Sequence, residues 1–513
     1  MISVHAKTNP KTSKCRLSTV VPLFLCACIS FNLLFVFKYL QRVNLNPARA
    51  GDINVPSLVI PGSKVTKGIE SDHKEPKHRL VPVATAKALE ISQTKPVVVA
   101  HVVSLIKCSK TASVTGFLDA AAVLRHSIHK QSVHAGTSTY SYKMYAIVHE
   151  NCREHAHVLD RLGYTALVKP SPVLLDEMKP GWYRDHVEGE KCCGSAEFIK
   201  LYAYTLLAHP IAVHWDMDVA IFKPMDDLFD SMLHTEDSPM GKQARAKLQL
   251  QHPERPLPKY INAFLTRDIT SSQPWETRQG VQGGFLVART SMHHFETYLD
   301  FIKGGNYTKG RGNDKGWAGL GYGGFQGAMA YQGAVAYFYD QFVPKTAVEL
   351  NACVWNQVVA DVVWRGPSAM QHCGQCREYP RPGDSFEDNT PENGKCEDCR
   401  VTPIDKVNSA HYTACKKPWE CSLPTPRIPK DKAQVGRLQE LTNITTCGLM
   451  VRRWFDLRQE FEDELRAAGG VEPSPRSGKY RIEYFGRYCS GAGHYIPMNP
   501  PPENFDSKTM YGV

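Results

Sequence analysis

The sequence predicts an α/β fold in which helices flank a mostly parallel β-sheet, and two observations support this. First, short apolar runs typical of buried strands alternate with segments of helical periodicity: strands at 97–103, 142–148 and 164–168, helices at 115–129 and 152–162. This alternation is typical of a doubly wound parallel sheet. Second, an apolar run at 211–213 leads into Asp216-Met217-Asp218, and open α/β sheets bind ligands at the carboxyl ends of their strands.

The later elements follow from the same patterns. A helix at 196–207 precedes the strand at 211–213, and strands at 284–288 and 335–342 enclose a helix at 291–302. A charged amphipathic helix at 448–468 closes the domain or packs outside it. The tail after Gly469 is rich in Pro, Tyr and Gly, and we expect it to wrap the surface.

The segment 304–333 holds 11 glycines, and three of them (Gly319, Gly321 and Gly324) satisfy the pattern G-x-G-x-x-G. A dinucleotide-binding turn needs a strand immediately before it within a βαβ unit, and none is predicted here. A mobile substrate loop is therefore the better interpretation.

The N-terminus predicts a membrane anchor. Residues 17–37 are 21 residues without a charge, which is long enough to cross a bilayer as a helix. A cleaved secretory signal is the alternative, but this run is longer than a signal core, and the site-like Ala48-Arg49-Ala50 lies well beyond its end. Four positive charges precede the span and favour a cytoplasmic N-terminus. We therefore expect a type II protein with everything after residue 38 in a lumen.

The net charge of +10 is concentrated at the N-terminus. The first 50 residues hold seven Lys and Arg and no Asp or Glu, which leaves +3 for the other 463 residues. A nucleic-acid partner therefore lacks support. The chain divides into a cytoplasmic tail (1–16), the anchor (17–37), a stem (38–94), the α/β domain (95–424) and a C-terminal helical and irregular extension (425–513). Nothing in the pattern indicates an oligomeric state.

Thirteen of the 16 cysteines lie beyond the membrane span. Two C-x-x-C pairs, Cys373/Cys376 and Cys396/Cys399, are separated by 19 residues, a spacing that by itself fits a four-cysteine zinc site. An oxidising lumen favours disulfides instead, with the connectivity open. Asn306-Tyr307-Thr308 and Asn443-Ile444-Thr445 are glycosylation acceptors that agree with a lumenal location.

Asp216 and Asp218 are the first candidate site residues. In an extended chain, residues i and i+2 project to the same side, so both carboxylates point together from the strand end and Met217 points toward the core. Two hard oxygen ligands in this arrangement suit a divalent cation that also carries phosphates. The alternative is a pair of capping aspartates at a turn.

Two further segments supply charges that such a site would use. Lys200 is the one cationic residue in the helical segment AEFIKLYAYTLL, which precedes the aspartate strand. His411 and Lys417 lie in HYTACKKPW; a neutral imidazole can complete a site made of two carboxylates, and a lysine can neutralise phosphate.

The three segments FIKLYAYTL, HWDMDVAIFKPMDDLFD and HYTACKKPW, in this order, resemble the glycosyltransferases of family 8, the glycogenin-like and galactosyltransferase-like group with the GT-A fold. The resemblance runs from about residue 96 to residue 424. It implies a GT-A type, Rossmann-like, mostly parallel sheet and a retaining hexosyltransferase that uses a nucleotide-sugar donor. In that family a histidine and a lysine are six residues apart, as His411 and Lys417 are.

The resemblance also implies roles for single residues. Asp216, Asp218 and His411 would hold Mn²⁺ (or Mg²⁺), and Lys417 and Lys200 would contact the diphosphate or the donor sugar. Residues Val103, Ser104 and Leu105 would meet the uracil and ribose of a UDP-sugar. Expected partners are this donor and a glycan or protein acceptor, with the lumenal domain anchored in the Golgi or endoplasmic reticulum membrane.

The sequence also departs from the family's pattern. Gln282-Gly283-Gly284 stands where the family often has Asn-Ser-Gly or Asn-Ala-Gly. The family's Asp-Gln pair is matched by Tyr331-Gln332, with Phe325-Gln326 the weaker match, so Gln332 takes the catalytic position without its acidic neighbour. Residues 366–402 form a cysteine-rich insertion. Two alternatives remain: an inactive lumenal carbohydrate-binding protein on the same fold, and a nucleotidyltransferase.

Overall fold

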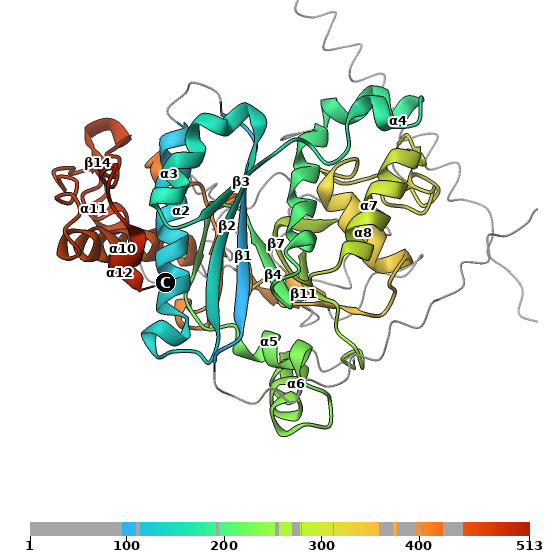
Figure 1. Cartoon of the computed structure of the whole chain (residues 1–513), viewed down its shortest axis with the longest axis horizontal. Helices are drawn as coiled ribbons and strands as arrows, with labels where there is room; N and C mark the ends of the chain where they lie inside the picture. The colour runs from blue at the N-terminus through green and yellow to red at the C-terminus, as the bar shows by residue number, and fades with distance from the viewer. Residues whose placement is uncertain are drawn as a thin grey trace, which may run out of the picture. The chain divides into compact units, whose positions relative to one another are not determined.

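The computed structural model describes residues 95–108, 113–190, 194–251, 256–268, 278, 280–310, 312–358, 373–376, 396–399, 402–423 and 445–512 (Figure 1). All of these residues belong to one compact unit, Val83–Val513. Within these ranges, no helix combines the length and the apolar character that crossing a bilayer requires. The predicted tail, anchor and stem (residues 1–94) lie outside the described residues.

Seven strands of the described chain form the central sheet, in the order β10-β6-β7-β4-β1-β2-β3. Their bounds are β1 Val98–Leu105, β2 Ser141–His149, β3 Thr165–Lys169, β4 Ile211–Trp215, β6 Ala263–Arg267, β7 Val281–Arg289 and β10 Ala347–Glu349. All neighbours pair in parallel except those of β7, which runs antiparallel to both β4 and β6. The sheet is mostly parallel, as the sequence predicts.

Helices cover both faces of this sheet (Figure 1). One face carries α2 (Ser113–Lys130) and α3 (Ala156–Arg161), and the other carries the 3₁₀ helix η5 (Gly194–Thr205), α7 (Met292–Gly304) and α8 (Tyr331–Gln341). Apolar side chains from each set of helices pack with strand residues into separate buried clusters. Burying both faces in this way is what a parallel sheet requires.

Smaller elements lie around this framework. The short helices are α4 (Trp182–His186), α5 (Asp226–Leu233) and α6 (Pro239–Gln251). Two-stranded sheets pair β5 (Val219–Ile221) with β13 (Ser409–His411), β8 (Tyr307–Thr308) with β9 (Gly316–Trp317), and β11 (Cys373–Cys376) with β12 (Cys396–Asp398). The β8–β9 pair lies in the glycine-rich segment.

The strand prediction for 335–342 is wrong, because residues 335–341 belong to α8 and Phe342 is its C-cap. Tyr331, Ala334, Val335 and Phe338 are buried at spacings of three and four residues, which is a helical period. The short apolar run alone did not distinguish a strand from a buried helix. Two other segments differ in detail: 196–207 forms a 3₁₀ helix, and the predicted helix 152–162 begins with a 3₁₀ turn at Glu150–His155.

The C-terminal extension packs against the helical face that carries α2. Its helix α10 (Thr446–Ala467) contacts α2 and is followed by α11 (Ile482–Phe485), the hairpin β14 (Cys489–Ser490) and β15 (His494–Tyr495), and α12 (Ser507–Tyr511). Asp119 of α2 accepts hydrogen bonds from Tyr495 Oη (2.7 Å) and from the Met498 backbone N–H (3.0 Å). The predicted helix 448–468 is therefore present, packed outside the sheet.

Four disulfides join cysteines of the described chain: Cys108–Cys152, Cys353–Cys399, Cys415–Cys447 and Cys421–Cys489. Cys399 is thus disulfide-bonded, as predicted, although its partner lies outside the C-x-x-C pairs. The expected bonding of Cys373, Cys376 and Cys396 concerns side chains outside the described residues.

Candidate functional site

The central sheet and the two-stranded β5–β13 sheet bring the predicted metal ligands together. Asp216 follows β4 directly, and its backbone N–H donates to Gly284 O (3.0 Å) on β7. Asp218 precedes β5, which pairs antiparallel with β13 so that Val219 lies opposite His411. The Tyr412 backbone N–H then donates to Asp218 O (2.8 Å). Backbone hydrogen bonds therefore fix Asp216, Asp218 and His411 relative to one another.

The three side chains converge. His411 Nε2 lies 3.4 Å from Asp218 Oδ1 and 3.8 Å from Asp216 Oδ2, and one ligand atom from each residue lies within 4.8 Å of the others. Met217 is buried in the core and points away, as alternation predicts. Two carboxylates and one imidazole are a donor set that can hold a divalent metal ion. The cluster is compatible with a divalent cation.

Gly284 keeps the space between these ligands clear. A Cβ atom at this position would lie 2.4 Å from His411 Cε1 and 2.8 Å from Asp216 Oδ2. Neither group can retreat easily, because His411 is on a paired strand and Asp216 is bonded to the same glycine's carbonyl. The cluster therefore requires glycine at position 284, because a larger residue would collide with two of its three ligands.

Each carboxylate also contacts one lysine. Lys200 Nζ donates to Asp216 Oδ1 (2.9 Å), and Lys417 Nζ contacts Asp218 Oδ2. Burial would raise the pKa of Asp218, but the Lys417 charge and the hydrogen bonds from Lys417 and His411 outweigh it and hold this pKa well below its usual range. The pKa of Asp216 is lowered in the same way, with Lys200 outweighing burial. Both carboxylates are therefore anionic at neutral pH, as a metal site requires.

Lys200 and Gln332 both bind the backbone of Gly283. Lys200 Nζ donates to Gly283 O (3.2 Å), and the Gly283 N–H donates to Gln332 Oε1 (3.0 Å) from the first turn of α8. Gln332 and Lys200 are thus both bonded to Gly283, the residue next to Gly284, which faces the metal ligands. Its expected catalytic role stays a prediction.

Sequence reasoning missed Asp268. This buried carboxylate directly follows β6, and its Oδ2 lies 3.4 Å from Gln332 Nε2. In the family's Asp-Gln pair the acidic residue directly precedes the glutamine, but here that position is Tyr331. Asp268, at the end of β6, supplies the acidic neighbour of Gln332 instead. The sequence does show an aspartate after the apolar run AFLTR, but only the order of the strands in the sheet brings it close to Gln332.

The third group of predicted site residues ends β1. Because β1 pairs with β4 and Val103 lies opposite Trp215, this strand end is adjacent to Asp216. The side chains of Val103 and Leu105 are buried in the core, whereas Ser104 Oγ is 3.2 Å from His214 Nε2. Burial lowers the pKa of His214 to about 3, so its imidazole is neutral.

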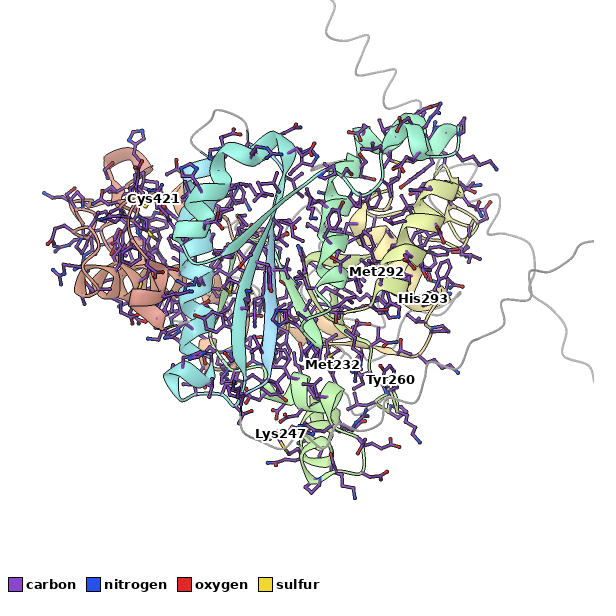
Figure 2. The ribbon with its side chains drawn as sticks, in the orientation of Figure 1. Met232, Lys247, Tyr260, Met292, His293 and Cys421 are labelled. Atoms are coloured by element: carbon purple, nitrogen blue, oxygen red, sulfur yellow. A yellow bond between two sulfur atoms is a disulfide. The ribbon has the colours of Figure 1, made fainter. Side chains whose placement is uncertain are left out.

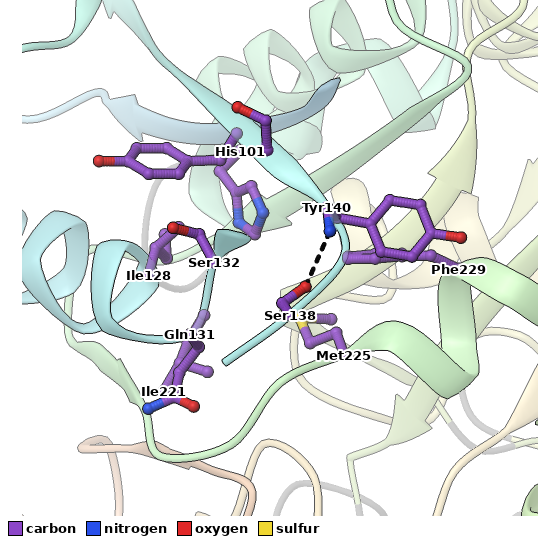
Figure 3. A pocket seen from close by; sticks show the side chains of 11 residues that line it. His101, Ile128, Gln131, Ser132, Ser138, Tyr140, Ile221, Met225 and Phe229 are labelled. Carbon is purple, nitrogen blue, oxygen red and sulfur yellow. Dashed lines mark hydrogen bonds between the residues drawn. The ribbon is translucent and has the colours of Figure 1, made fainter. Parts of the chain in front are cut away.

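A pocket in the described chain shares no residue with this cluster (Figure 3). His101, Tyr140 and Phe229 are among its lining side chains, and the Tyr140 backbone N–H donates to Ser138 Oγ (3.0 Å). Burial lowers the pKa of His101 to about 3, and its Nδ1 accepts a hydrogen bond from Trp215 Nε1 (3.0 Å). The lining contains no carboxylate, so we locate the chemistry at the metal-ligand cluster.

No model of a known protein family matches the chain, and no curated protein matches its sequence. Among solved structures, the chain is similar to mouse xyloside xylosyltransferase 1 in its apo form (12% identity over 62% of this chain and 98% of that one, TM-score 0.32). It is also similar to the galactosyltransferase LgtC in complex with donor and acceptor sugar analogs (11%, 72% and 99%, TM-score 0.33). A third is the glycosyltransferase GlyE of Streptococcus pneumoniae (10%, 72% and 64%, TM-score 0.30). Identities and scores of this size transfer neither activity nor substrate.

Proposed function

We propose that this chain is a metal-dependent glycosyltransferase of the family-8 type, which moves a sugar from a UDP-sugar to a glycan or protein acceptor with retention. The observation that carries the proposal is the convergence of Asp216, Asp218 and His411 beside Lys200 and Lys417. The five residues come from three segments distant in the sequence. The sequence resemblance to family 8 rests on the same three segments.

The charges of the site fit a nucleotide diphosphate. Two aspartates and two lysines sum to zero, so a divalent cation leaves the site with two positive charges, which match the charge of a diphosphate. Breaking the sugar–phosphate bond leaves negative charge on the departing nucleotide. A bound Mn²⁺ or Mg²⁺ would stabilise that charge where it develops.

Lys417, Lys200 and Gln332 have separate roles in the proposed reaction. Lys417 donates charge-assisted hydrogen bonds, and a diphosphate oxygen can replace Asp218 as its acceptor. Lys200 keeps Asp216 anionic and orders the Gly283 backbone, to which Gln332 is also bonded. Gln332, whose amide is bonded to Gly283 N–H and to Gln326 O, would take the position of the family's catalytic glutamine.

Incubating the full-length protein with a panel of nucleotide sugars, with and without acceptors and Mn²⁺, tests this function. We expect metal-dependent release of UDP that increases with an acceptor. Glycan binding without UDP release under any condition would favour an inactive carbohydrate-binding protein. Release of pyrophosphate from a nucleoside triphosphate and a sugar phosphate would favour a nucleotidyltransferase.

We also propose that the enzyme is a type II membrane protein whose described unit lies in the Golgi or endoplasmic reticulum lumen. The uncharged span at 17–37 and the four disulfides support this, because disulfides persist in oxidising compartments. Protease digestion of sealed microsomes should spare the chain beyond residue 38. Its digestion without detergent would overturn the topology.

A further inference from the structure

The segment that carries His411 and Lys417 leaves the sheet between these two residues. His411 is held by β13, and the Tyr412 N–H makes the last bond to the β5 side of the site. Beyond Tyr412 the chain crosses the surface of α10, and Lys417 then returns to contact Asp218. Sheet hydrogen bonds therefore fix the imidazole, and something else must fix the lysine.

Residues on one face of α10 contact this segment at three points. Cys447 forms the disulfide with Cys415, and Met450 O accepts a hydrogen bond from Tyr412 Oη (2.7 Å). Trp454 lies 6.1 Å from Trp419, ring centroid to ring centroid. Positions 447, 450 and 454 are spaced by three and four residues and so share one face of the helix.

The backbone between Cys415 and Lys417 adopts an unfavourable conformation. Lys416 has φ = 71°, in the left-handed region that residues with a Cβ atom rarely occupy. Such a residue keeps this conformation only where its surroundings determine it. Here the preceding Cys415 is bonded to α10, and the following Pro418 and Trp419 are buried. The exposed Lys416 side chain makes no packing contribution of its own.

The Lys417 side chain is then guided by two rings. Its Nζ lies 5.3 Å from the Phe117 ring centroid and 5.7 Å from that of Trp419, and the two rings pack edge to face at 5.2 Å. These contacts orient the ammonium group toward Asp218 but do not set the backbone from which it extends. That backbone lies between the 3₁₀ turn Pro418–Glu420, where the Glu420 N–H donates to Lys417 O (2.9 Å), and the Cys415–Cys447 bond two residues before Lys417.

We propose that the Cys415–Cys447 disulfide and the left-handed Lys416 are positioning elements that hold Lys417 over the nucleotide-diphosphate site. The C-terminal extension thereby completes a site whose other residues come from the α/β domain. This inference rests on the proposed function, because it assigns a diphosphate to Lys417. A second disulfide, Cys421–Cys489, joins the end of the same segment to the tail (Cys421 is labelled in Figure 2) and provides a matched control.

The test is a double-mutant cycle on the full-length protein, with UDP affinity in saturating Mn²⁺ measured by calorimetry. Removing the bridge with C415A/C447A should weaken UDP binding by roughly threefold to tenfold, a change of about 0.6 to 1.4 kcal/mol. Mn²⁺ affinity without nucleotide should be no weaker than in the parent, because His411 stays on β13. In a K417A background the same bridge removal should change UDP affinity by less than about twofold, because the positioned group is gone.

Two further variants separate positioning from general stability. C421A/C489A removes one disulfide from the same segment and should leave UDP affinity within about twofold of the parent. Adding K416G to C415A/C447A should restore part of the lost affinity, because glycine adopts a positive φ without support. Should C415A/C447A fold poorly, C415V/C447A replaces the lost volume and is expected to show the same loss of UDP binding.

Three results would overturn the inference: unchanged UDP affinity without the bridge, an equal loss in the K417A background, or an equal loss in C421A/C489A. Each is distinct from failure of the proposed function, in which the parent itself would bind no UDP in the presence of Mn²⁺.

Discussion

The two lysine–aspartate pairs of the site are built in opposite ways. In the Lys200–Asp216 pair the lysine side chain is 5% exposed and the carboxylate 32% exposed; in the Lys417–Asp218 pair the lysine is 27% exposed and the carboxylate 5%. The buried member of each pair needs a compensating charge: Lys200 is held inside the protein beside Asp216, and Asp218 must gain a cation before Lys417 can leave it. Lys200 is therefore a fixed part of the structure, whereas Lys417 can exchange Asp218 for a ligand.

The same difference appears in what holds each pair. Asp216 and Lys200 are bonded to consecutive residues of β7, Gly284 and Gly283, so the central sheet supports them. Lys417 depends on a segment that is cross-linked to the C-terminal extension. The Lys200–Asp216 half of the site is therefore supported by the sheet, and Lys417, the group proposed to meet the nucleotide, is supported by a cross-link, so variants can address each half.

The largest expected effect comes from Asp218, which is both a candidate metal ligand and the partner of Lys417. Asp218→Asn removes a ligand atom and a negative charge but keeps the side-chain volume. Mn²⁺ affinity should fall by roughly a hundredfold or more, since even partners of metal ligands are worth about 10- to 100-fold. Calorimetry with Mn²⁺ measures this, and thermal unfolding controls for the fold. Near-normal Mn²⁺ binding and turnover would show that the aspartates are structural.

The next variant, Gly284→Ala on β7, crowds the metal ligands His411 and Asp216. In Gly284→Ala the new Cβ atom would meet His411 Cε1 at 2.4 Å and Asp216 Oδ2 at 2.8 Å, and both are held by backbone bonds. We expect Mn²⁺ affinity to fall by about 10- to 100-fold, measured by the same calorimetry, and the free energy of unfolding to fall by about 1–3 kcal/mol.

Gly283→Ala is the matched control for this steric argument. Its Cβ atom would meet the Gln332 Cγ at 2.9 Å, and Gln332 is a flexible side chain at the start of α8. Mn²⁺ affinity should therefore change less than in Gly284→Ala. Equal losses in the two variants would contradict the role assigned to Gly284.

The sequence predicts the parts of the site that depend on local patterns, and it does not predict those that depend on strand order or disulfide pairing. The strand at 211–213 and the alternation of Asp216, Met217 and Asp218 are local patterns, and the structure places them as predicted. The neighbourhood of Asp268 and Gln332 depends on strand order, which local patterns do not contain. The same is true of the Cys353–Cys399 pairing, since connectivity among many cysteines is not set by spacing.

A third comparison distinguishes the fixed lysine from the exchangeable one. Lys200→Met leaves Asp216 without its partner and should lower the free energy of unfolding by about 1–3 kcal/mol, below the range for a fully buried pair because Asp216 is partly solvated. Without metal, Lys417→Met should also cost about 1–3 kcal/mol of stability, because it leaves the buried Asp218 with only His411 beside it, and bound Mn²⁺ should recover this loss. This variant should strengthen Mn²⁺ binding without nucleotide, because the cation no longer competes with an ammonium group for Asp218. Denaturant unfolding and Mn²⁺ titration of both variants provide the measurements; weaker Mn²⁺ binding in Lys417→Met would refute the exchange.

The smallest effect on the site is expected where the extension attaches to α2, at Asp119. Burial raises the pKa of this carboxyl to about 6, even though Arg458 and the hydrogen bonds from Met498 and Tyr495 oppose the shift. A raised folded-state pKa means that the protonated carboxyl favours folding. Asp119 therefore stabilises the protein fully below its ordinary pKa of 3.8, and this contribution is lost as the pH rises from there through about 6.

Asp119→Asn tests this attachment, because the amide retains the shape of the carboxyl and does not titrate. The unfolding free energy of the parent minus that of the variant should decrease by about 2 kcal/mol between pH 4 and pH 7, because most of the rise in pKa from 3.8 to about 6, at about 1.36 kcal/mol per pH unit, takes effect over this range. Taking the difference cancels the groups common to both proteins. Mn²⁺ affinity should not change, since Asp119 lies on α2 and the metal ligands are held by the sheet strands and by β13. Parallel stability curves would show that the buried carboxyl titrates normally, and altered Mn²⁺ binding would show that the extension supports both halves of the site rather than the Lys417 half alone.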